Sequence, residues 1–109
     1  MGRKKEYMKK VVINSKEYVA KEFTFNLICD LEEMGYDMDS MGNKPMSVLR
    51  AYFSLCAGMN MEEAGKELEK HIIGGGDFGE LSEAMQEQLE KSDFFRNLTK
   101  SEEKETTKN

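Results

Sequence analysis

One stretch of the sequence, residues 46–57, is apolar over most of its length, with three polar residues among twelve. A helix over these residues is apolar around most of its circumference, which predicts an element buried inside the fold. Pro45 suits the first position of a helix, and Gly58 suits the left-handed residue just after its end. We therefore expect the other elements, which have one apolar face at best, to pack around this central helix.

The residues before this stretch predict a β-hairpin. Residues 7–13 include three consecutive β-branched side chains, and residues 17–23 alternate apolar and charged side chains. Asn14 lies between the two runs and tolerates a positive φ, which suits a tight turn. Because a two-stranded hairpin is only marginally stable by itself, it must lie on the helices or pair with another chain.

Three amphipathic helices are expected beside the central one. Each begins at a residue typical of an N-cap, and the second and third have the form of a capping box, N-cap-x-x-Glu. The N-caps and apolar faces are Thr24 with Leu27–Met34, Asn60 with Ala64–Ile72, and Asp77 with Leu81–Leu89. Gly35 is expected to end the first of these helices, and residues 36–44 to form a loop before the central helix.

The chain length and patterning predict one domain with a polar tail. We expect a mainly α domain over residues 1–98, with a hairpin at 7–23 and a helical body at 24–98, packed around the buried helix at 46–57. A break is expected at Ser92-Asp93, before two adjacent phenylalanines. Residues 99–109 contain no large apolar side chain and are expected to be a disordered polar tail.

Charge and hydropathy exclude several classes of protein. Residues 1–22 carry seven Lys or Arg against three Glu, whereas residues 23–109 carry nine basic against eighteen acidic residues. This acidic bulk argues against a nucleic-acid-binding body. No apolar run approaches the ~18 residues of a membrane span, and the basic residues at 1–10 are not followed by an apolar region as long as a secretory signal needs. We therefore expect a soluble cytoplasmic protein without nucleic-acid or membrane partners.

The motifs that resemble phosphate-binding or metal-binding sites each lack a required residue. Residues 74–76 are three glycines before a helix, but no Lys-Ser/Thr pair follows, as a phosphate-binding loop requires. Residues 37–48 begin like a calcium loop, yet Val48 stands where a bidentate Glu is needed. His71, the single histidine, is expected at the boundary of the core, and Cys29 and Cys56 as small buried hydrophobes. We therefore expect no enzyme activity, no metal and no cofactor.

Methionine and phenylalanine offer candidate contacts for a partner. Six of the nine methionines fall between residues 34 and 61, where they either fill an irregular core or form an adaptable binding surface. Met38 and Met41 lie in the polar loop and are expected to be the most exposed of them. Phe94 and Phe95 point about 100° apart on a helix, so one ring packs on the domain and the other is available to a partner.

Several short motifs together resemble one protein family. They are Ile13-Asn14, Lys16-Glu17-Tyr18, Phe23-Thr24-Phe25-Asn26, Leu31-Glu32-Glu33, Arg50-Ala51-Tyr52-Phe53, Cys56-Ala57-Gly58, Met61-Glu62-Glu63 and Leu81-Ser82-Glu83-Ala84. Spread over roughly residues 11–98, they resemble the small tail assembly chaperones of long-tailed bacteriophages and related prophages. The motifs are hydrophobic patterns and helix caps, with no catalytic signature among them.

The resemblance implies a non-catalytic function in virion assembly. Proteins of this family bind the long apolar helices of the tape measure protein, keep it soluble and recruit tail tube subunits around it. They act in the cytoplasm of the bacterial host and are absent from the finished virion. The alternative is a small helical phage-encoded adaptor or regulator that binds a host protein. Self-association into a homo-oligomer is compatible with the chaperone, whereas a regulator is expected to recognise one folded partner or a DNA site.

Overall fold

The computed structural model describes residues 9–98, which form a β-hairpin followed by helices. The bounds are β1 Lys9–Ile13, β2 Lys16–Ala20, α1 Phe25–Glu33, α2 Ser40–Asn43, α3 Pro45–Ala57, α4 Met61–Ile73 and α5 Gly79–Lys91, with a further helical turn at 93–98. The expected mainly α fold with an N-terminal hairpin is confirmed. The expected disordered tail at 99–109 and the start of the chain up to residue 8 lie outside the described residues.

The hairpin is closed by a two-residue turn. β1 and β2 are antiparallel, with Ile13 opposite Lys16 and Lys9 opposite Ala20. Asn14 and Ser15 both have positive φ, 53° and 69°, which is the combination that matches the twist of paired strands. β2 ends at Ala20, before the expected 23, because the backbone of Lys21 bonds to side chains of α3. Residues 7 and 8 of the expected first strand, 7–13, lie outside the described residues.

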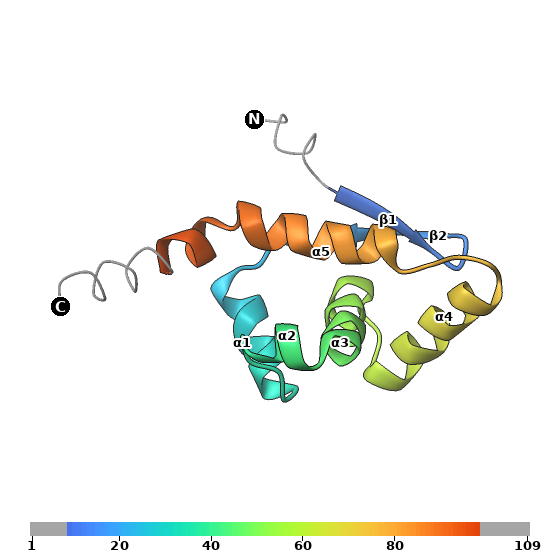
Figure 1. The fold of residues 1–109 in the computed structure, drawn as a ribbon, viewed down its shortest axis with the longest axis horizontal. Coiled ribbons are helices and arrows are strands. Elements are labelled where there is room, and N and C mark those ends of the chain that lie inside the picture. Colours follow the sequence, from blue (N-terminus) through green and yellow to red (C-terminus); the bar gives the residue numbers. More distant parts are fainter. Residues whose placement is uncertain (1–8, 99–109) are drawn as a thin grey trace.

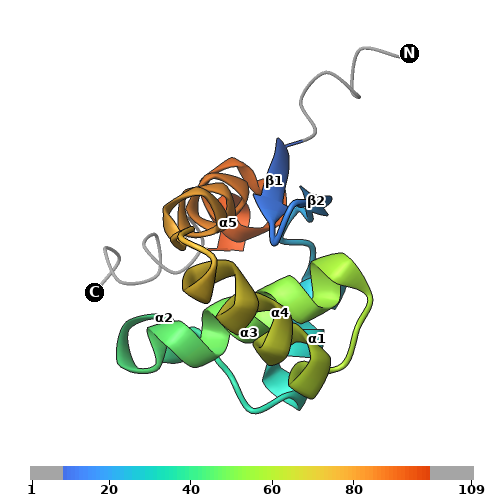
Figure 2. The same ribbon diagram turned by 90° about the vertical axis from the view of Figure 1, so that its right-hand side faces the viewer.

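The elements form two layers, and α3 contacts elements of both. Figure 1 shows the hairpin lying along α5, with α1 to α4 gathered on the other side of α5. The quarter turn in Figure 2 shows the same division, with α5 and the hairpin above and the remaining helices below. Helix α3 contacts β2, α1, α2, α4 and α5. The prediction of a central helix is therefore confirmed.

The core is built from the apolar faces that meet at α3. Tyr52 and Phe53 are fully buried, Tyr52 stacks on Phe23 with ring centroids 5.2 Å apart, and Phe53 meets the edge of Tyr18 at 4.9 Å. Gly58 ends α3 with a φ of 70°, the left-handed conformation expected there. None of the helices in residues 9–98 has the length and apolar character needed to cross a lipid bilayer.

Two local predictions are wrong. The expected loop at 36–44 contains the short helix α2, whose N-cap residue Asp39 makes no side-chain bond. In the turn before it, Asp37 accepts bonds from the backbone N–H and the hydroxyl of Ser40. The expected capping box at Asp77 does not form, since α5 begins one residue later, after Phe78, without a side-chain cap. Asp77 instead accepts the N–H of Gly79 at 2.8 Å. The N-caps Thr24 and Asn60 are confirmed.

Candidate functional site

A groove with apolar walls runs between α5 and the start of α3. It has a volume of about 530 Å³, and we call it the α3–α5 groove. Its apolar lining consists of Met41, Met46, Val48, Leu49, Phe78, Met85 and Leu89. Val48 and Leu49 are buried and form the floor, whereas Met46 on α3 is 61% exposed. The groove is therefore a concave apolar surface that solvent reaches, the kind of site that takes an apolar ligand or side chain.

The methionines divide between the core and the surface. Met38, expected to be exposed, is 37% exposed, but Met41 is only half-buried and packs against the core at the edge of the groove. Among residues 9–98 the most exposed methionine is Met46, which the sequence places on the central helix. Met38 is therefore exposed as expected, Met41 is not, and Met46 is more exposed than either. Binding by either residue remains a prediction.

A second hollow continues the groove toward α4. Its volume is about 310 Å³, and it shares Met46, Leu49 and Phe78 with the groove. Arg50 lines this hollow, and its Nε atom is buried without a hydrogen-bond partner in residues 9–98. Gly65 on α4 leaves room for Arg50, since a Cβ there would lie 3.3 Å from the Arg50 Cδ atom. A buried donor left unpaired is costly, so the arrangement of residues 9–98 leaves one hydrogen bond of the Arg50 side chain unmade.

A second exposed apolar surface lies where α1 begins. Phe25 is 59% exposed, and its ring centroid lies 5.4 Å from that of Phe94, which is 36% exposed. Phe95 is half-buried. Phe94 is therefore at the surface, and binding of a partner by either ring remains a prediction. The ring neighbour of Phe94, Phe25, was not among the contacts predicted from the sequence.

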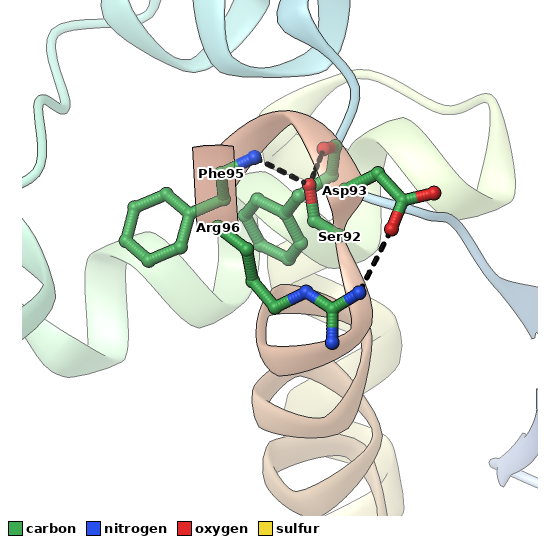
Figure 3. A network of polar contacts seen from close by, with 5 residues as sticks. Ser92, Asp93, Phe95 and Arg96 are labelled. Carbon is green, nitrogen blue, oxygen red and sulfur yellow. Dashed lines mark hydrogen bonds and ion pairs between the residues drawn. The ribbon is translucent and has the colours of Figure 1, made fainter. Parts of the chain in front are cut away.

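Ser92 holds the turn that carries Phe94. It is fully buried, its hydroxyl donates to the carbonyl oxygen of Phe23, and its oxygen accepts the N–H of Phe95 at 3.0 Å. Figure 3 shows these two bonds meeting at Ser92, with an ion pair between Asp93 and Arg96 beside them. Ser92 is thus the N-cap of the turn at 93–98 and also its anchor to the segment before α1. The expected break at Ser92-Asp93 is confirmed.

Side chains from the helices cap the outer edge of the hairpin. The N–H of Val12 donates to Glu80 Oε1 at 3.2 Å, and the N–H of Asn14 donates to His71 Nδ1 at 3.0 Å. At the other strand, the N–H and the carbonyl of Lys21 are both bonded to side chains of α3. These bonds occupy outward backbone groups at the turn end of the hairpin and just after β2, where a strand from another chain would otherwise pair. Of the two options for the hairpin, packing on the helices is the one observed.

His71 joins the hairpin turn to the connector between α4 and α5. Its Nδ1 accepts from Asn14, and its Nε2 lies 3.0 Å from the carbonyl oxygen of Asp77, so the neutral ring with a proton on Nε2 satisfies both contacts. Glu67 accepts a bond from the Asn14 side chain, and this bond lowers the pKa of the Glu67 carboxyl. His71 is half-buried, at the core boundary as expected, and serves as a structural tie.

The thiol of Cys56 is a weak nucleophile in the folded protein. Burial raises the pKa of its thiol, and the bond that its sulfur accepts from the N–H of Lys21 lowers it by less. Burial also raises the pKa of Tyr52, whose hydroxyl donates to the carbonyl oxygen of Lys21 at 2.6 Å. Both cysteines are free and half-buried, rather than fully buried as expected. In the described part of the chain, no three His, Cys, Asp or Glu side chains cluster to hold a metal ion.

Comparisons with other proteins add no relative. No family model matches the chain, and no curated protein or solved structure gives a significant match.

Proposed function

We propose that this protein is a non-catalytic tail assembly chaperone that binds the tape measure protein of a long-tailed bacteriophage. The observation that carries the proposal is the α3–α5 groove, an open apolar surface on an acidic, mainly helical body. A tape measure protein with long apolar helices needs such a surface to cover it before the tail tube assembles. The sequence resemblance to this family supports the same reading.

The complex of chaperone and tape measure protein then carries out the later steps of tail assembly. The chaperone keeps the tape measure protein soluble in the cytoplasm of the bacterial host and recruits tail tube subunits to it. It then leaves, so that the finished virion does not contain it. Methionine side chains suit this function, because they are flexible and can pack against helices with different surface shapes.

Co-expression with the tape measure protein tests the proposal. The gene should lie between a tail tube gene and a very long reading frame, and that reading frame supplies the probe. We expect the long protein to stay in the soluble fraction and to co-purify with the chaperone. The control is the same plasmid with a stop codon early in the chaperone gene, which should send the long protein to the pellet.

Two results would contradict the chaperone. One is a long protein that stays equally soluble with the stop codon, and the other is the absence of any co-purifying complex. Either result would favour the alternative function of an adaptor for a host protein. A pull-down from host lysate, followed by identification of a single stoichiometric partner, would then be the next experiment.

A further inference from the structure

We infer that the α3–α5 groove and the hollow beside it bind one amphipathic helix of the partner, about three turns long, with Lys or Arg beside its apolar stripe. The inference rests on the proposed function, because it assigns that function to one site and one kind of segment. It excludes the Phe25–Phe94 pair as the primary contact.

The walls of the groove select a helix over a strand. Both walls are helices, α3 and α5, whose backbone N–H and C=O groups are mostly bonded within the helices themselves. An extended segment lying there would find few backbone partners, whereas a helix satisfies its own. The wall on α5 runs from Gly79 to Leu89, which at 1.5 Å per residue is about 15 Å. This length accommodates about three turns of a bound helix.

The charge around the groove selects a basic flank. On α5 the carboxylates beside the groove are Glu83 and Glu90, each next in sequence to a residue that lines it, whereas Glu80 and Glu87 bond to β1 on the hairpin side. Helix α4 lies beside the second hollow. Glu69 lines that hollow directly. Lys and Arg beside the apolar stripe of the bound helix would meet these carboxylates, whereas Glu or Asp there would be repelled. Binding should therefore weaken as the salt concentration rises.

Arg50 gives the bound helix a direction. Arg50 lines the second hollow with a cationic side chain, whose buried Nε has no acceptor in residues 9–98. The last turn of a helix has carbonyl oxygens without partners in the helix, and these carry partial negative charge. We therefore place the C-terminal end of the bound helix at Arg50 and its N-terminal end toward Met41.

Methyl NMR on the wild-type protein tests where a helix binds. The probe is a synthetic 18-residue peptide with Leu at i, i+3, i+4 and i+7 spacing and Lys on the flanks. It is titrated into protein labelled with ¹³C at the Met methyl groups. We expect saturable shifts of Met41, Met46 and Met85, which line the groove, and little change at Met59 and Met61, which pack elsewhere on the core.

A control peptide and two variants make the test specific. The same peptide with Glu in place of Lys should bind at least tenfold more weakly. Met46→Glu should weaken binding of the Lys peptide at least tenfold, and Phe25→Glu by less than twofold. Both sites are exposed and lie in the first turn of a helix, where a carboxylate is tolerated, so both variants should fold. Arg50→Met should also weaken binding, and melting curves confirm the fold.

The possible results test the groove assignment and the chaperone function separately. Equal binding of the two peptides, shifts confined to Met59 and Met61, or a larger effect of Phe25→Glu than of Met46→Glu would overturn the groove assignment. If Met46→Glu still co-purifies with the tape measure protein as wild type does, the chaperone function stands and the groove assignment falls. If the peptide binds the groove but the tape measure protein never co-purifies, the groove assignment stands and the chaperone function falls.

Discussion

Replacing Ser92 with alanine should destabilise the fold by about 2–4 kcal/mol, a large effect for the loss of one oxygen atom. The hydroxyl is fully buried and makes two bonds, one to the Phe23 carbonyl and one from the Phe95 N–H. Loss of an N-cap costs about 1 kcal/mol. A buried carbonyl left without its donor costs about 1–3 kcal/mol more. The substitution also releases the turn that places Phe94 against Phe25.

Urea unfolding followed by far-UV circular dichroism measures this cost. In a domain of this size each 1 kcal/mol moves the Tm by about 4–8 °C, so thermal melts should show a drop of roughly 8–30 °C. The matched control is Ser82→Ala, at an exposed serine in the interior of α5. It should stay within about 0.5 kcal/mol of wild type, because no buried bond is lost.

Equal stability of the two alanine variants would refute this reasoning. It would mean that the Phe23 carbonyl is satisfied in some other way, for example by a water molecule that enters the site. A loss of stability in Ser92→Ala alone, with an unchanged urea m-value, would instead support the two buried hydrogen bonds of Ser92. The m-value matters because a change in it reports altered exposed surface rather than a lost bond.

Four further predictions follow from other contacts. Phe53→Ala should cost about 3–5 kcal/mol because it empties the centre of the core, and an unmoved urea midpoint would contradict the central helix. His71→Ala should speed hydrogen exchange of the Asn14 amide by removing its acceptor, and unchanged protection would argue against this tie. The hydrogen bond to Glu67 lowers its pKa in the fold, so its contribution to stability is full above the unfolded pKa of about 4.3 and is lost as pH falls below it. Glu67→Gln should make the unfolding free energy less dependent on pH between 5 and 3, and identical pH profiles would count against it. The thiol of Cys56 has a raised pKa, so its reaction with a disulfide reagent at pH 8 should accelerate when urea unfolds the chain, and equal rates would contradict burial.

The sequence was sufficient where the signal is local. The caps at Thr24 and Asn60, the left-handed residue at Gly58 and the apolar run of α3 all depend on neighbours within a few positions, and all are confirmed. The capping box at Asp77 has an equally clear local pattern and is wrong. There Glu80 reaches the backbone of Val12 on β1, 68 residues away, and the helix start shifts accordingly.

The candidate contacts were harder to predict because exposure depends on how elements pack. Met46 belongs to the most apolar stretch of the chain, yet it lies in the first turn of α3, where its side chain extends beyond the packed core. Met41 belongs to a polar loop by composition but is drawn against the core by helix α2. Two of the three polar residues of the central helix, Ser47 and Arg50, lie three positions apart and therefore share one helix face. This is the face that lines the second hollow.

The arrangement of open and closed surfaces limits how this protein can bind a partner. A two-stranded hairpin would normally invite a strand from another chain to pair with its edge, and main-chain bonds would then supply much of the affinity. Here Glu80 bonds the outward N–H of Val12 in β1, His71 bonds the N–H of Asn14 in the turn, and α3 bonds the backbone of Lys21 just after β2. The α3–α5 groove, by contrast, is open and offers side chains and few backbone groups. A partner that binds there must arrive with its own backbone already bonded, and a helix is the segment that meets this condition.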